Sequence, residues 1–331
     1  MEPAILIPAA VLISFLLTGL ATWYSARRGL IDHPGERHSH TVATPRGGGA
    51  GLVLTLVIFS LLIFSEDDGF WMRCALPGIV VLSVLGWWDD HASLSARFRF
   101  LIQLAVSLYL IGYGQHSGWP GGVLQFAGAA LFLLWMTNLY NFMDGSNGMA
   151  GFQGVFGAVV LACLFEQAGD HQIAAAAALL AACCLGFLPW NLGRARVFMG
   201  DTGSLALGFA LGALLIYGVA TGAFGLPVAL MVMLVFLTDS TLTLLLRVLR
   251  GERWYTAHKQ HLYQRLIVHG WTHARVLLFY QAINLTLVVP AIVVADNYPA
   301  VAWTVALAMI LALGLGWYLV LRSIGVFARA G

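Results

Sequence analysis

Polar residues able to do chemistry gather in a few short stretches of an otherwise apolar chain. The first stretch is the adjacent pair Asp89 and Asp90. Neighbouring side chains point about 100° apart on a helix, so one carboxylate could reach a metal ion or a reacting group while the other orients it. The alternative is a hydrated pair of charges at the end of a membrane-spanning helix. Two adjacent aspartates alone do not decide between these interpretations.

The second stretch, NLYNFMDGSNG, occupies residues 138–148. Its polar residues recur at every third position, so a continuous helix would place them on one strip of its surface. Such amide and carboxylate groups bind polar ligands or the water shell of a metal ion. The alternative is a capped helix end in which the glycines make the turn. The concentration of polar groups favours binding by Asn138, Asn141, Asp144 and Asn147.

The third stretch, NLGRARVFMGDTGS, begins at Asn191. Asp201 lies between two glycines, which would let a metal-bound oxyanion approach the chain closely. Arg194 and Arg196 could bind phosphate, as could the start of the helix that follows. Asp201 could instead serve only to cap that helix.

Basic residues dominate two further stretches. His258, His261 and Arg265 would share one face of a helix, which suits either phosphate binding or an interfacial helix. A zinc site is disfavoured because no cysteine or third ligand lies nearby. The first loop supplies cations and glycine amides suited to an anion; its candidate residues are Arg37, His38 and His40.

Asp239 interrupts a long apolar run. An unpaired carboxylate inside a membrane helix would cost several kcal/mol. We therefore expect Asp239 to face a polar cavity, with Arg247 or a residue of the metal site as its partner.

The elements that position these groups follow from the composition. The 331 residues are 60% hydrophobic and only 10% charged, with a mean hydropathy of +0.84; soluble domains average about 25% charged residues. Water-soluble, nucleic-acid-binding, disordered and coiled-coil proteins are thereby excluded. We predict an all-α polytopic integral membrane protein, a single domain over residues 1–331. Apolar runs predict about eleven transmembrane helices, near residues 3–24, 48–65, 72–88, 98–114, 121–140, 152–168, 172–190, 203–222, 224–246, 276–295 and 299–321.

The basic residues predict the orientation of these helices. All but one of the 17 Lys and Arg residues fall in alternate connections and the C-terminal tail, and Arg73 is the exception. The positive-inside rule then places the N-terminus in the periplasm and the C-terminus in the cytoplasm. The four cysteines lie in apolar runs and match neither disulfide nor metal spacing. We expect the active site to form from the cytoplasmic loops 25–47, 89–99, 138–151, 191–202 and 247–275.

Phosphoryl transfer at a membrane surface is the chemistry that these groups suit. Carboxylates bind Mg²⁺, for which Mn²⁺ can substitute, amides bind a sugar or base, and cations bind phosphates. The four stretches containing Asp89, Asn138, Asn191 and His258 occur in an order that resembles the polyprenyl-phosphate N-acetylhexosamine-1-phosphate transferase family. The resemblance covers the chain from about Asp32 to Arg275.

The resemblance implies a reaction and a role for each matched residue. The family transfers N-acetylhexosamine-1-phosphate from a UDP-N-acetylhexosamine to undecaprenyl phosphate in the bacterial inner membrane. Asp89 and Asp90 match its Mg²⁺-binding pair, one member of which deprotonates or orients the lipid phosphate, and Asp201 matches its metal-ligating Asp. His258 and His261 match a late motif that contacts the phosphates or sugar of the donor. The strip 138–147 and Asn191 match its nucleotide and metal site.

Two departures bear on the donor. The muramoyl branch of the family has three consecutive histidines where this chain has His258-Lys-Gln-His261, which argues against muramoyl-pentapeptide as donor. His38 stands where the GlcNAc branch often has Lys. Both differences favour an enzyme that initiates O-antigen or another surface glycan.

Two other functions stay open, namely a muramoyl-pentapeptide phosphotransferase and a secondary transporter of nucleotide-sugars. A transporter would carry polar groups at mid-membrane and paired repeats, and neither is evident. The partners expected are the lipid bilayer, undecaprenyl phosphate and the UDP-sugar, with no nucleic acid. A homodimer is one of the oligomeric states left open.

Overall fold

The computed structural model describes residues 3–32, 43–64, 69–253 and 258–327. The chain divides into two compact units. The larger comprises the described residues from 3 to 224, and the smaller comprises the described residues from 225 to 327. Most of the described residues are helical. Arg37, His38 and His40 lie outside the described residues.

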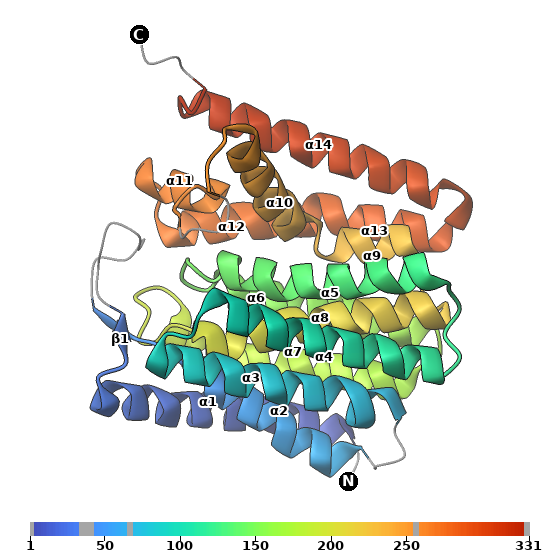
Figure 1. Ribbon diagram of the computed structural model, residues 1–331, viewed down its shortest axis with the longest axis horizontal. Helices are drawn as coiled ribbons and strands as arrows, with labels where there is room; N and C mark the ends of the chain where they lie inside the picture. Colours follow the sequence, from blue (N-terminus) through green and yellow to red (C-terminus); the bar gives the residue numbers. More distant parts are fainter. Residues whose placement is uncertain (1–2, 33–42, 65–68, 254–257, 328–331) are drawn as a thin grey trace. The chain divides into compact units, whose positions relative to one another are not determined.

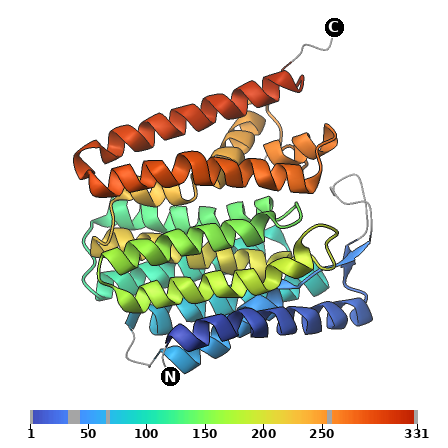
Figure 2. The same cartoon turned by 180° about the vertical axis from the view of Figure 1, so that it is seen from behind.

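Long helices that run alongside one another make up the larger unit (Figures 1 and 2). Two strands of two residues each, β1 (Ile31–Asp32) and β2 (Thr44–Pro45), pair antiparallel. A π-helical turn, η1 (Trp71–Ala75), leads directly into the helix that begins at Leu76. The helices are α1 (Pro3–Arg28), α2 (Gly49–Ile63), α3 (Leu76–Ala92), α4 (Ala96–His116), α5 (Val123–Met143), α6 (Met149–Gln167), α7 (His171–Asn191) and α8 (Gly200–Thr221).

The smaller unit has shorter and more broken helices. The axis bends by 79° between its first two helices, at Met233. A second π-helical turn, η2 (Asn284–Val288), interrupts another long helix, and a 3₁₀ turn, η3 (Pro299–Val301), precedes the last one. The helices are α9 (Leu226–Val232), α10 (Leu234–Leu249), α11 (Leu262–Val268), α12 (His273–Ile283), α13 (Val289–Asn297) and α14 (Ala302–Ser323).

The predicted class, an all-helical polytopic membrane protein, is confirmed. Each of the eleven predicted spans overlaps a helix. Among the described residues, eight helices are long and apolar enough to cross a membrane, and the bent pair α9–α10 could form a ninth crossing. Helix α2, with 15 residues, is shorter, and α4 is not among the eight. The count of eleven and the orientation of the termini stay predictions.

Helix α8 lies at the centre of the packing in the larger unit. It contacts α2, α3, α5 and α6, and every residue from Thr202 to Leu215 is buried. Glycine lets α3 approach its first turn, because a Cβ on Gly86 would collide with the backbone of Asp201. The end of α3 and the start of α8 therefore meet at the end of the unit where β1 lies (Figure 1).

Candidate active site

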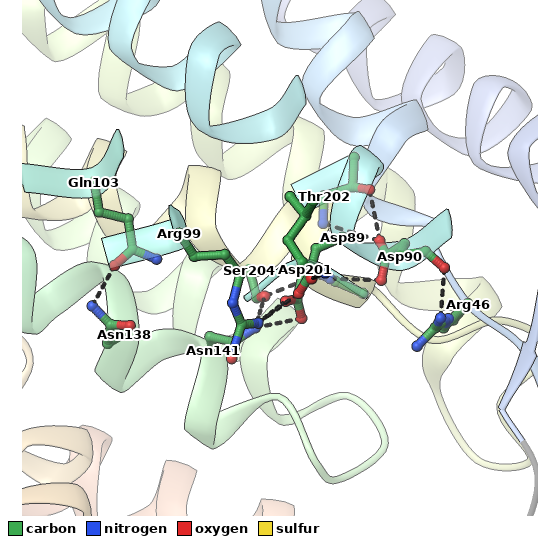
Figure 3. A network of polar contacts seen from close by, with 12 residues as sticks. Arg46, Asp89, Asp90, Arg99, Gln103, Asn138, Asn141, Asp201, Thr202 and Ser204 are labelled. Carbon is green, nitrogen blue, oxygen red and sulfur yellow. Dashed lines mark hydrogen bonds and ion pairs between the residues drawn. The ribbon is translucent and has the colours of Figure 1, made fainter. Parts of the chain in front are cut away.

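Two carboxylates from different helices share one guanidinium. Asp89, near the end of α3, and Asp201, in the first turn of α8, both contact Arg99 of α4 (Figure 3). Arg99 Nη1 lies 2.5 Å from Asp89 Oδ2 and 3.1 Å from Asp201 Oδ2. The backbone N–H of Leu94 also donates to Asp89 Oδ1, at 2.5 Å. The structure thus brings together the two predicted metal ligands.

Asp90 points away from its neighbour and caps α8. Its Oδ2 accepts hydrogen bonds from Thr202 N at 3.2 Å and Thr202 Oγ1 at 2.7 Å. Its Oδ1 accepts one from Asp201 N at 3.3 Å. The first N–H groups of a helix have no partner within the helix and favour a negative charge, so this carboxylate holds the start of α8 in place. Arg46 Nη2 donates to the backbone oxygen of Asp90 at 2.5 Å.

Asn141 binds the other oxygen of the Asp201 carboxylate. Its Nδ2 donates to Asp201 Oδ1 at 2.7 Å and to Ser204 Oγ at 2.9 Å. Asn138, one turn earlier, donates to Gln103 Oε1 at 2.7 Å. Only one of these two amides therefore reaches the carboxylate cluster (Figure 3).

The prediction of a continuous helical strip through residue 147 is wrong. Helix α5 ends at Met143, and Asp144 is its C-cap. Burial raises the pKa of Asp144 well above its usual range, and the negative charges of Asp201 and Asp90 act in the same direction. A backbone hydrogen bond from Gly200 opposes them. Asp144 is thus close enough to Asp90 and Asp201 to feel their negative charges, although it lies beyond the end of the helix.

Asn147 and Asn191, the last residue of α7, connect neighbouring loops. Asn147 Nδ2 donates to Gly193 O at 2.7 Å. The buried Asn191 accepts from Gly148 N at 2.7 Å and donates to Val197 O at 2.9 Å. Both polar groups of the Asn191 amide therefore engage the backbone.

The predicted phosphate-binding arginines of this loop lie on the surface. Arg194 and Arg196 are both exposed. The Arg196 guanidinium lies 5.7 Å from the centroid of the Trp190 ring. The structure does not bring either side chain to the carboxylate cluster.

Backbone hydrogen bonds tie the end of the first loop to the VFMGD segment. Phe198 N donates to Pro45 O at 2.8 Å, and Gly48 N donates to Phe198 O at 2.9 Å. The chain on the C-terminal side of the undescribed residues 33–42 is thereby fixed beside Asp90 and Asp201.

In the smaller unit, the predicted helical face with two histidines does not form. Helix α11 begins at Leu262, His261 is its N-cap and His258 precedes it. The two imidazole rings nevertheless lie 4.8 Å apart, centroid to centroid. Burial, reinforced by His261, Arg247 and Arg265, lowers the pKa of His258 to about 3. His258 is therefore neutral near pH 7.

A chain of polar contacts surrounds these histidines. Arg247 Nη1 lies 3.1 Å from Glu252 Oε2, which also accepts from Gln260 Nε2 at 2.7 Å. Arg265 donates through Nε to Gln260 O at 2.7 Å and through Nη2 to Gln260 Oε1 at 3.0 Å. Burial lowers the pKa of His261 as well. The cluster contains two guanidinium groups that could bind an anion, and the carboxylates of Glu252 and Asp239 lie near them.

The carboxylates suit a divalent cation chemically, although they do not form a finished metal site. In the part of the chain that the structure describes, no three His, Cys, Asp or Glu side chains are grouped as metal ligands. Magnesium prefers oxygen ligands of the kind that Asp89 and Asp201 supply. The two carboxylates also contact each other directly. Because Arg99 Nη1 contacts one oxygen of each, a cation that binds both of these oxygens would displace the guanidinium from at least one of them.

Sequence reasoning missed Arg99, Arg46 and Thr202 as members of this site. The one signal for Arg99 was a cation in the first turn of a helix shortly after the Asp pair.

Comparison with known proteins identifies the family to which the chain belongs. The model of glycosyl transferase family 4 matches residues 72–219. A decaprenyl-phosphate N-acetylglucosaminephosphotransferase of Mycobacterium tuberculosis is 31% identical over 313 residues, which cover 81% of this chain and 76% of the relative. The chain belongs to glycosyl transferase family 4. The resemblance to polyprenyl-phosphate N-acetylhexosamine-1-phosphate transferases is thereby confirmed.

Two other relatives have names that describe different sugar-phosphate transfers. A probable undecaprenyl-phosphate N-acetylglucosaminyl 1-phosphate transferase of Bacillus subtilis is 28% identical over 310 residues, covering 88% of this chain and 86% of the relative. A phospho-N-acetylmuramoyl-pentapeptide-transferase of Synechococcus sp. is 31% identical over 313 residues, which cover 85% of this chain and 87% of the relative. The segment matched by the family model contains Asp89, Asp90 and Asp201, and the His258 stretch follows it.

Proposed function

We propose that this chain transfers N-acetylhexosamine-1-phosphate from a UDP-N-acetylhexosamine to undecaprenyl phosphate and releases UMP. The observation that carries the proposal is the pairing of Asp89 and Asp201 on one guanidinium at the end of a bundle of apolar helices. Two carboxylates that share the Arg99 guanidinium suit the binding of a metal ion that carries the diphosphate of the donor. The names of the relatives support a polyprenyl phosphate acceptor. We place the reaction at the cytoplasmic face of the bacterial inner membrane, in the initiation of O-antigen or another surface glycan.

Asp89 and Asp201 would hold Mg²⁺, which neutralises the charge that develops on the diphosphate. Asn141 holds one oxygen of Asp201, and its other oxygen faces Arg99. Asp90 fixes the start of α8 and thus the position of Asp201. Once one carboxylate releases Arg99, its guanidinium can pair with a phosphate oxygen.

The chemistry proposed is a single displacement. An oxygen of undecaprenyl phosphate forms a bond to the β-phosphorus of the UDP-sugar. The bond from that phosphorus to the bridging oxygen breaks, and its electron pair leaves with UMP. We assign the phosphates of the donor to the segment that contains His258, His261 and Arg265.

The decisive experiment measures UMP release by the purified, detergent-solubilised protein. It contains Mg²⁺, undecaprenyl phosphate and one of several UDP-N-acetylhexosamines. We expect release that requires both lipid and metal, and that Asp201→Asn reduces at least a hundredfold. Folded protein that binds no UDP-sugar and releases no UMP with any donor would overturn the proposal.

Muramoyl-pentapeptide transfer is the second candidate, because relatives with that name align over most of the chain. Including UDP-N-acetylmuramoyl-pentapeptide among the donors separates the two activities. We expect it to be a poor donor, since the chain lacks three consecutive histidines at 258–261. A nucleotide-sugar transporter would leave every UDP-sugar intact in the same assay.

A further inference from the structure

The carboxylate of Asp239 is the most heavily hydrogen-bonded acid in the smaller unit as the structure describes it. Asp239 lies in α10 and is 2% exposed. We had expected Arg247 or a residue of the metal site as its partner, but the donors come from α10, α11, α12 and α14. They are Leu262 N at 2.7 Å, Tyr263 N at 3.3 Å, Tyr280 Oη at 2.7 Å, Thr243 Oγ1 at 3.2 Å and Trp317 Nε1 at 3.3 Å.

Two of these five donors are the first amides of α11. Oδ1 accepts from Leu262 and Oδ2 from Tyr263. These amides have no partner within their own short helix, and a buried carboxylate without donors would be strongly unfavourable. Each group therefore satisfies the other. Because α11 begins immediately after His261, the Asp239 carboxylate fixes the point where the histidine segment enters the helix.

We propose that Asp239 is a positioning residue that anchors the segment from His258 to Arg265. It holds the first turn of α11 on α10 and so sets the location of His261 and, one turn later, of Arg265. Asp239 itself touches no substrate. The kinetic consequence rests on the proposed function, in which this segment binds the phosphates of the donor, whereas the anchoring does not.

A purely structural role for Asp239 predicts something different. The donors Thr243 and Trp317 join Asp239 to α10 and α14 without involving α11. If Asp239 only stabilises the packing of these helices, removing any of its donors should act alike. If it anchors α11, only changes at the two amides should disturb the histidine segment.

The first experiment measures amide hydrogen exchange in the peptide that contains Leu262 and Tyr263. Asp239→Asn keeps the size of the side chain but removes its charge and one acceptor, and we expect exchange at least tenfold faster there. Thr243→Val is the matched control, with exchange at this peptide unchanged. Equal exchange in Asp239→Asn and wild type would overturn the anchoring.

A second variant acts from the backbone side. Leu262→Pro deletes the amide that donates at 2.7 Å, and His261, with φ −59° and ψ 148°, already has the conformation that precedes proline. Leu262→Ala controls for the lost side chain. We expect the proline variant, and not the alanine variant, to speed exchange at Tyr263. This pair keeps the proposal testable if Asp239→Asn does not fold.

Kinetics then link the anchor to the donor. In Asp239→Asn we expect KM for the UDP-sugar to rise about tenfold while KM for undecaprenyl phosphate stays within twofold, and Thr243→Val should resemble wild type. Faster exchange with an unchanged donor KM would overturn the kinetic part and leave the anchor. No turnover by wild type would count against the proposed function, while the exchange result would still decide the anchoring.

Discussion

Asp90 and Thr202, 112 positions apart, are joined by two hydrogen bonds. One comes from the threonine amide and one from its hydroxyl, and both end on the same carboxylate oxygen. This contact separates the roles of the two adjacent aspartates. Asp90 is occupied in holding α8, which leaves Asp89 to share Arg99 with Asp201.

Substituting the two aspartates should therefore have different effects. Asp90→Asn weakens the cap of a buried helix and should lower the free energy of unfolding by about 1–3 kcal/mol. Asp89→Asn, on a more exposed side chain, should lower it less and abolish turnover. Thermal unfolding in detergent and UMP release, measured on the same preparations, check both. Equal losses of stability would contradict the division of roles.

Arg99 should compete with a divalent cation. Because its guanidinium contacts one oxygen of both Asp89 and Asp201, Arg99→Gln should tighten Mn²⁺ binding a few-fold in the absence of substrate and still reduce turnover. Arg99→Lys, which keeps the charge, serves as control and should bind Mn²⁺ like wild type. Electron paramagnetic resonance of free Mn²⁺ measures the affinity. Weaker binding by Arg99→Gln would show that the ion binds elsewhere.

Gly200 should tolerate no side chain. It has a φ of +73°, and an added Cβ would lie 2.7 Å from Asp90 Oδ2 and 2.8 Å from Gly47 N. Gly222, at the other end of α8, has a φ of +77° with no atom within 4 Å of an added Cβ. Both alanine variants carry about 1–2 kcal/mol of backbone strain, but only Gly200→Ala should also lose UMP release. Similar activities in the two variants would contradict the close packing at Asp90.

Acid should destabilise the protein partly through His258. Its pKa is lowered to about 3 in the folded chain, whereas an unfolded chain binds the proton near pH 6.5. The unfolded state therefore holds more protons between these values, and stability falls as the pH drops through that window. His258→Gln should lose less thermal stability than wild type between pH 7 and pH 5. An identical pH profile for both proteins would refute this contribution.

A single displacement predicts that the lipid controls isotope exchange. Labelled UMP should enter UDP-sugar only when undecaprenyl phosphate is present, because no covalent enzyme intermediate forms. An aspartyl-phosphate intermediate would permit exchange without lipid. Asp89→Asn, assayed in parallel, provides the background rate. Robust lipid-free exchange by wild type would exclude the single step.

Apolar run length, charge placement and motif order predicted the helices and the grouping of Asp89, Asp90 and Asp201. Long uniform runs specify a helix by themselves, whatever the rest of the chain does. The ends of α5 and α11 were misjudged, because the polar spacing continues past Met143 and begins before Leu262. Helical periodicity does not reveal where the chain leaves the helix.

The partners of charged groups were harder to predict. Asp239 meets donors as distant in sequence as Trp317, and Arg99 reaches Asp201 from another helix. Such pairs depend on which faces of α4, α8, α10 and α14 point inward. Membrane helices that are apolar on every side carry little amphipathic signal to specify this.

Helix α2 has a consequence for the surrounding lipid. Its 15 residues make a rod of about 22 Å, whereas the hydrocarbon layer is about 30 Å thick. If α2 is one of the predicted spans, the lipids beside it would have to thin or admit water to match its length. Gly48 and Gly49 tie the start of this helix to Phe198 and Met199. Thinning of the bilayer at this end of α2 would bring the lipid headgroups closer to Asp201, so that a lipid phosphate could approach the carboxylates while its hydrocarbon tail stays in the bilayer core.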